Sequence, residues 1–166
     1  MAQQIAQLQA DHRCAVQALD LLRTTLEERS GVVDYILLAE IVASLTSQLD
    51  LQHRHREDAI FEGISACDPS LLTLREEVRR SHRDLQQLGD DLRLAMAAAR
   101  AGRAPSAEQV SGLCRRYAKA VRDHVDMAEE VVLPLADRLL DGHDWAVVDW
   151  KVDVRSTCRL ARRLPA

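Results

Sequence analysis

The stretch QLDLQHRHREDAIFE, residues 48–62, decides the fold class of this chain. Leu49, His53 and Glu57 follow one another at four-residue steps, a spacing that puts side chains on one face of a helix. Ile60 extends the same face with an apolar residue. The face is therefore expected to point into a core, yet two consecutive positions on it are polar. Because burial of unpartnered polar groups is unfavourable, the stretch predicts a helix whose inner face carries a polar site.

Three other helical stretches show the same interruption, with a histidine where the apolar period predicts a core residue. At a rise of about 1.5 Å per residue, the distances to the expected turns place the four histidines within roughly 2–6 Å of one another in depth. Imidazoles and carboxylates that meet inside a helical bundle form the ligand set of a two-metal carboxylate site. The sequence therefore predicts a metal site made of His12, His53, Glu57, His82, His124 and Glu129.

The composition favours a single all-α domain, residues 1–166. Hydrophobic residues make up 47% and charged residues 29% of the chain, which is the balance of a globular protein, and the aromatic share of 3% favours helices. Breaks are predicted at Ser30-Gly31, at Asp68-Pro69 and at 102–105, and Ser106 with Gln109 forms a capping box. We predict an up-down-up-down four-helix bundle with a short C-terminal fifth helix. The helices are expected at about 3–29, 33–67, 69–101, 107–140 and 145–163.

Charge and cysteine content narrow the range of partners and locations. The formal net charge of −4 provides no general attraction to nucleic acid or to anionic membranes, so neither is an expected partner. The N-terminal region lacks a signal-peptide pattern and no long apolar stretch occurs, so we expect a cytoplasmic protein. The cysteines form no CxxC pair, and as reduced thiols they would act as small apolar residues. They are Cys14, Cys67, Cys114 and Cys158.

Nearly the whole chain resembles the hemerythrin-like family, also called the HHE cation-binding domain. The resemblance rests on an ordered set of motifs on four helices, whereas a single HxxxE would be weak support. The matching stretches are QADHRCAVQALDLL (9–22), QLDLQHRHREDAIFE (48–62), REEVRRSHRDLQQL (75–88) and RDHVDMAEEVVLPLADRLL (122–140), with DGHDWAVVDW (141–150) similar to the segment that follows the fourth helix.

The resemblance implies two non-haem iron ions, joined by an oxo or hydroxo bridge when oxidised. His12 and His53 would bind one iron, and His82 and His124 the other. Glu57 and Glu129 would bridge the pair.

This chain departs from the family pattern at three places. Oxygen-carrying members have a second histidine one turn from the first on the third helix, but Val78 and Gln86 stand one turn either side of His82. The second-helix motif ends in IFE where the family usually has an LFP-like sequence. Glu129 follows His124 by five residues, a step that rotates roughly 140° around an ideal helix. Glu129 is preferred over Glu130 as the bridging residue, because the family uses both four- and five-residue spacings and position 128 is alanine.

By this resemblance, the protein would bind or react with a small ligand, O2, NO or peroxide, in oxygen handling or in oxidative or nitrosative stress. Turnover at the di-iron centre competes with reversible O2 storage or sensing. Iron donation for repair of iron–sulfur proteins is a further alternative, and a purely structural bundle is the last. Tyr117 lies two turns before His124 on the same face, so it either packs in the core or lies beside a metal-bound ligand. The catalytic residues, if any, are not identified by the sequence.

Overall fold

A computed structural model describes residues 2–27, 35–48, 51–103 and 106–163 of the chain. These residues form an all-α protein, and no β-strand occurs among them. The elements are α1 (Ala2–Glu27), α2 (Tyr35–Gln48), α3 (Leu51–Cys67), the 3-10 turn η1 (Pro69–Leu71), α4 (Leu72–Arg100), α5 (Ala107–Met127), the π-helical turn η2 (Ala128–Val132), α6 (Leu133–Leu139) and α7 (Gly142–Arg163).

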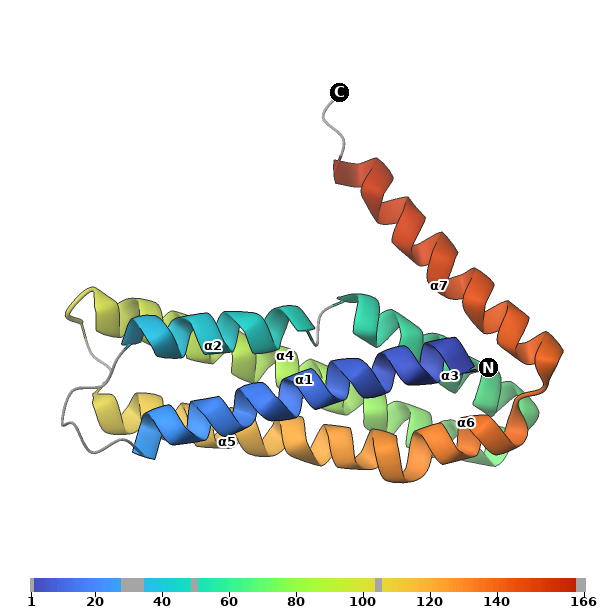
Figure 1. Ribbon diagram of the computed structural model, residues 1–166, viewed down its shortest axis with the longest axis horizontal. Helices are drawn as coiled ribbons and strands as arrows, with labels where there is room; N and C mark the ends of the chain where they lie inside the picture. Colours follow the sequence, from blue (N-terminus) through green and yellow to red (C-terminus); the bar gives the residue numbers. More distant parts are fainter. Residues whose placement is uncertain (1, 28–34, 49–50, 104–105, 164–166) are drawn as a thin grey trace.

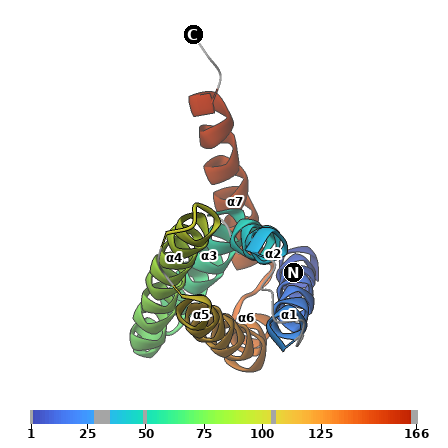
Figure 2. The same ribbon diagram turned by 90° about the vertical axis from the view of Figure 1, so that its left-hand side faces the viewer.

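The bundle follows the predicted up-down-up-down order. Figure 1 shows α1, the α2–α3 pair, α4 and the α5–α6 pair running side by side along the long axis, each in the direction opposite to the one before. The end-on view of Figure 2 places α1, α2, α4 and α5 at the four corners. α7 leaves the end of the bundle obliquely, and its C-terminal part projects beyond the other helices. The predicted all-α bundle is confirmed.

Three of the predicted helices differ in detail from those described. The helix expected over 33–67 is two helices, α2 and α3, and residues 33–34 and 49–50 lie outside the described residues. The helix expected over 107–140 contains the π-helical turn η2. The fifth helix begins at Gly142 instead of 145. The predicted break at Ser30-Gly31 lies outside the described residues, as do residues 104–105 of the break at 102–105.

Local capping signals act where the sequence placed them. Asp68 precedes η1 with extended backbone, and its side chain accepts a hydrogen bond of 3.0 Å from the Ser70 amide. The Gln109 amide donates to Ser106 Oγ at 3.3 Å, and the Ser106 amide donates to Gln109 Oε1 at 2.8 Å, which completes the capping box. Gly102 follows α4 with φ of 66°, the left-handed conformation that glycine adopts at low cost after a helix.

A buried polar layer divides the apolar core into two clusters. One cluster lies among α1, α2, α4 and α5 and includes Leu19, Leu45 and Leu92. The other lies mainly among α3, η2, α6 and α7 and includes Ile60 and Trp145. On α1, along α2 and α3, and on α4 the chain passes from one cluster to the other at a predicted site histidine, and on α5 it does so shortly after His124, because Val125 still belongs to the first cluster. The pairs that flank these histidines are Leu8 and Ala15 around His12, Leu45 and Ala59 around His53, Val78 and Leu85 around His82, and Val121 and Val132 around His124.

Candidate metal centre

Glu57 of α3 is the central group of the polar layer. Its side chain is 2% exposed, and its two oxygens face two different pairs of histidines. Oε1 lies 3.7 Å from His12 Nε2 and 3.6 Å from His53 Nε2. Oε2 lies 2.6 Å from His82 Nε2 and 3.3 Å from His124 Nε2. One carboxylate therefore contacts imidazoles from all four bundle helices.

The histidine rings group in the same way as the oxygens they face. The ring centroids of His12 and His53 are 4.9 Å apart, and those of His82 and His124 are 5.0 Å apart. His124 lies farther from the first pair, at 6.3 Å from His12 and 6.2 Å from His53. All four rings are buried. The structure thus brings together five of the six residues predicted for the site, with His12 and His53 on one side of Glu57 and His82 and His124 on the other.

The donor atoms on the His12 and His53 side are spaced for a cation. His12 Nε2 and His53 Nε2 are buried and have no hydrogen-bond partner, which is an unfavourable state for polar atoms unless something else binds them. Their separations from Glu57 Oε1 exceed hydrogen-bond length. Two ligands held about 2.1 Å from one ion lie about 3.0–3.6 Å apart for angles near 90–120°. Donors from His12, His53, Glu57 and His124 all lie within 4.8 Å of one another.

The side of Glu57 that faces His82 and His124 has no room for an ion between His82 and the carboxylate. The contact of 2.6 Å between His82 Nε2 and Glu57 Oε2 is a direct hydrogen bond that leaves no space for an ion between these two atoms. An ion on this side would require His82 to move away from the carboxylate. The arrangement fits one cation without rearrangement, and binding of two ions stays a prediction.

The carboxylate at the centre is held in its charged form. Burial alone raises the pKa of Glu57, but the charge of His124 and the contacts with His12, His124 and His53 outweigh burial and place this pKa well below its usual range. Burial lowers the pKa of His53, but Asp11 and Glu57 act more strongly together and raise it to about 9. Without a metal ion, His53 therefore carries a proton at neutral pH. A metal ion must displace that proton to bind at His53 Nε2.

Three of the histidines have a polar partner on the ring nitrogen that faces away from Glu57. His12 Nδ1 lies 2.7 Å from Glu129 Oε1, His53 Nδ1 lies 3.4 Å from Asp11 Oδ2, and His124 Nδ1 lies 3.4 Å from Ser81 Oγ. Partners of this kind fix the ring orientation and the tautomer of metal-binding histidines. In each case the partner leaves Nε2 directed at the shared carboxylate.

The sequence reasoning missed Asp11 and Ser81, although a signal was present. Each is a polar residue immediately before a site histidine, Asp11 before His12 and Ser81 before His82. Neither residue contacts the histidine that it precedes, because adjacent residues on a helix face different directions. Each instead contacts the histidine of a neighbouring helix. Arg56 Nη1 donates to Asp11 Oδ2 at 3.3 Å, which also helps to lower the pKa of Asp11 against the effect of burial.

Glu129 is the one predicted ligand that the structure leaves outside the group around Glu57. It lies on the π-helical turn η2, its side chain is 31% exposed, and it contacts the outer nitrogen of His12. Gln9 Nε2 donates to its other oxygen at 3.3 Å. The five-residue step from His124 has directed this carboxylate toward α1 and away from Glu57. Its role as a bridging ligand stays a prediction, and in this structure Glu129 is a partner of His12. Glu130 is exposed.

A comparison with protein-family models identifies the family of this chain. The model of the hemerythrin HHE cation-binding domain matches residues 3–136, which run from the start of α1 into α6. The chain belongs to the hemerythrin family. Searches of curated proteins and of solved structures found no match. Among the described residues of this hemerythrin domain, no helix is long and apolar enough to cross a membrane.

In this hemerythrin domain a groove between α1 and α5 reaches the candidate metal centre at His12. A cavity of about 410 Å³ lies there and is lined by His12, Arg13, Val16, Val125 and Glu129, among others. Both His12 and Glu129 line this cavity, and Glu129 is the more exposed of the two, at 31% against 2%.

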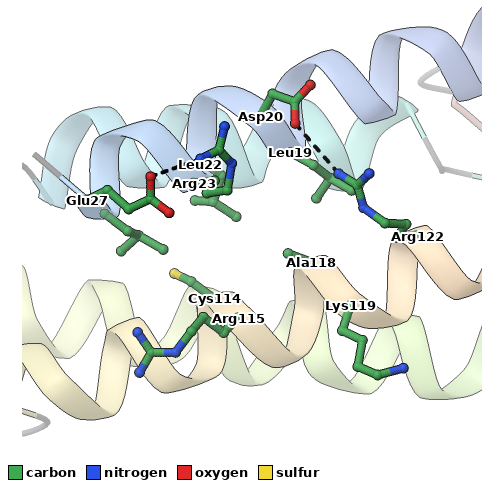
Figure 3. A pocket seen from close by; sticks show the side chains of 11 residues that line it. Leu19, Asp20, Leu22, Arg23, Glu27, Cys114, Arg115, Ala118, Lys119 and Arg122 are labelled. Atoms are coloured by element: carbon green, nitrogen blue, oxygen red, sulfur yellow. Dashed lines mark hydrogen bonds and ion pairs between the residues drawn. The ribbon is translucent and has the colours of Figure 1, made fainter.

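A further cavity of about 610 Å³ lies along the same helix pair and touches none of the four histidines. Figure 3 shows Leu19 and Leu22 of α1 facing Cys114 and Ala118 of α5 across it. At its rim Arg122 lies 3.6 Å from Asp20. Burial raises the pKa of Cys114 to about 11, so this thiol is uncharged at neutral pH. The prediction that the cysteines act as small apolar residues fits Cys114, which is buried, but not Cys14 and Cys67, which are exposed. The side chain of Cys158 lies outside the described residues.

Proposed function

We propose that this protein is a non-haem di-iron protein that binds or reacts with a small ligand, O2, NO or peroxide, in oxygen handling or in the response to oxidative or nitrosative stress. The observation that carries the proposal is the position of Glu57, whose oxygens face His12 and His53 on one side and His82 and His124 on the other. A carboxylate with one oxygen toward each pair would bridge two cations once His82 moves away from Glu57 Oε2. A cytoplasmic location is part of the same proposal.

Each residue of the centre has a distinct task. The four imidazoles supply neutral nitrogen ligands, which suit iron and other first-row transition metals. Glu57 would lie between the two ions and offset their charge. Asp11, Ser81 and Glu129 hold three of the imidazoles in orientation from outside. Iron bound here would supply redox chemistry and coordination positions that the protein does not fill.

The surroundings of the centre restrict access by water. The apolar residues on either side of the layer are buried, among them Leu8, Val78, Leu85 and Val121. A dry site strengthens electrostatic interactions within it and disfavours side reactions with solvent. Because only two imidazoles face each oxygen of Glu57, each ion would keep more open positions than in a three-histidine site. This supports binding of a small exogenous ligand over a purely structural role.

Metal analysis tests the proposal. Protein expressed with iron supplied should contain about two irons per chain, with the near-ultraviolet charge-transfer bands of an oxo-bridged di-iron centre. His53→Ala and His124→Ala should each lower the iron content sharply. His143→Ala is the matched control, because His143 is exposed at the start of α7 and should leave the iron content unchanged. Wild-type iron retention in either site variant would remove that residue from the centre.

The reaction itself is tested by stopped-flow spectroscopy of the reduced protein mixed separately with O2, NO and peroxide. Rapid spectral change with repeated consumption of peroxide or NO would indicate turnover. Reversible change with O2 alone would indicate storage or sensing. Loss of iron to an apo iron–sulfur acceptor, with no reaction toward the three ligands, would contradict the proposal and support iron donation.

A further inference from the structure

A small cavity that is partly open to solvent lies where α2, α3, α4 and α5 meet, away from the groove between α1 and α5. Its volume is about 60 Å³. Of the described residues, none with a carboxylate lines it, whereas two guanidinium groups, a phenol and a carboxamide do. The lining residues are Thr46, Arg54, Leu85, Gln86, Gly89, Arg93 and Tyr117.

The polar groups around this cavity are nearly all hydrogen-bond donors. Arg54 Nη1 donates to Gln86 Oε1 at 3.0 Å, so the oxygen of this carboxamide is occupied and its NH2 group is the part left to donate. Tyr117 is 2% exposed and carries a hydroxyl deep in the bundle. Burial raises the pKa of Tyr117 to about 12, while Arg54 and Arg93 act in the opposite direction, which places both positive charges near the phenol. At neutral pH the hydroxyl is therefore a donor.

Gly89 makes room for this arrangement. A Cβ atom at this position would lie 3.1 Å from Thr46 Cγ2 and 3.5 Å from Tyr117 Cε2. Glycine inside a helix costs about 0.5–1 kcal/mol relative to alanine. Its presence in the middle of α4 lets the Tyr117 ring lie against the helix beside the cavity.

The cavity volume limits the occupant to a few atoms. One water molecule needs about 10–15 Å³ of such space, whereas pockets for organic ligands enclose about 300–1,000 Å³. Arg93 forms an ion pair with Asp90, so Arg54 supplies the positive charge that, together with the donor groups around it, selects for an anion. We propose that this cavity is a binding site for a small inorganic oxyanion of about three to five non-hydrogen atoms, with Arg54 and Tyr117 as its main ligands and Gln86 and Arg93 beside them.

This site is separate from the metal centre but adjoins it through the chain. Arg54 directly follows His53 on α3, and Gln86 stands one helical turn after His82 on α4. The proposal does not depend on iron. It can therefore fail or succeed independently of the proposed function.

Calorimetric titration of the full chain with sodium nitrate and with sodium phosphate tests the site, with sodium chloride at matched ionic strength as the reference salt. Titrations are made on both the metal-free and the iron-loaded protein. We expect saturable binding of one oxyanion per chain in both forms. Because a hydrogen bond to a charged group is worth about 1.5–3 kcal/mol, Arg54→Gln and Tyr117→Phe should each weaken binding about tenfold or more. Arg103→Gln is the matched control, since Arg103 is exposed in the turn after α4 and should leave binding unchanged.

The results separate the proposal from its rivals. Absence of saturable binding in the metal-free protein would overturn it, and so would equal weakening by the Arg103 variant, which would indicate attraction to surface charge alone. Binding seen only in the iron-loaded protein, and insensitive to Arg54→Gln, would assign the anion to the metal and also overturn the proposal. If Tyr117→Phe fails to fold, the Arg54 variant still decides, because Arg54 is only partly buried.

Discussion

Raising the pH should lower the free energy of unfolding of the metal-free protein, and His53 should account for this loss. Burial lowers the pKa of His53, but the carboxylates of Asp11 and Glu57 outweigh it and raise the pKa from 6.5 to about 9. The folded state thus binds more protons than the unfolded state between pH 6.5 and 9. Under proton linkage, the free energy of unfolding falls as pH rises through this window. The stabilisation is fully present below pH 6.5 and is lost above about pH 9.

The difference between the two pKa values of His53, 6.5 and about 9, sets the size of this effect. A difference of about 2.5 pH units at about 1.4 kcal/mol per unit corresponds to a contribution of about 3 kcal/mol from His53. This is a large share of the roughly 5–15 kcal/mol by which domains of this size are stable. The slope should approach about 1.4 kcal/mol per pH unit in the middle of the window.

Urea unfolding of the metal-free protein at several pH values from 6 to 9.5 measures this slope. The wild type is compared with His53→Gln, because other groups that titrate in this range contribute equally to both. The difference between the two proteins should shrink by about 3 kcal/mol across the window. With metal bound, His53 holds no proton at Nε2 and the difference in slope should disappear. Parallel profiles for the two metal-free proteins would refute the assignment of a raised pKa to His53.

Four further substitutions have defined outcomes. Glu57→Gln should abolish the retention of iron through desalting, as measured by metal analysis. Glu129→Gln should still retain iron, with an affinity lowered about 10–100-fold, which is the usual effect of losing an outer partner of a ligand. Equal loss of iron in both variants would instead place Glu129 among the ligands. Asp11→Asn should lower the metal affinity by about 10–100-fold, measured in a competition titration with a chelator, and should leave the helix content unchanged. An unaltered metal affinity would show that Asp11 does not orient His53. Ser106→Ala should lower the free energy of unfolding by about 1 kcal/mol through loss of the capping box, measured by urea unfolding, without change in iron content.

The features of the fold that follow from local sequence rules were predictable. Apolar residues at helical spacing identified the bundle helices, and the caps at Asp68 and Ser106 set two helix starts close to those observed. The site histidines were found because each one interrupts an otherwise apolar stripe. Burial in a core makes such an interruption unfavourable, so the pattern alone indicated that these side chains meet a partner.

The features that depend on contacts between helices were not predictable. Asp11 and Ser81 contact histidines 42 and 43 residues away in the sequence, and no local pattern specifies such a pair. The direction of Glu129 depends on the π-helical turn η2, because a change in the hydrogen-bond register rotates every later side chain. The division of one expected helix into α2 and α3 likewise leaves the apolar stripe intact and gives no signal in its period.

The division of the core by a polar layer affects the cooperativity of unfolding. Two apolar clusters on either side of five ionisable groups can open as separate cooperative units when nothing joins them. A cation held by donors from several bundle helices links the two units and adds its binding free energy to their joint stability. Hydrogen exchange of backbone amides should then report two protection levels in the metal-free chain and a single one in the loaded chain. The persistence of the folded protein would accordingly follow the supply of the cation that it binds.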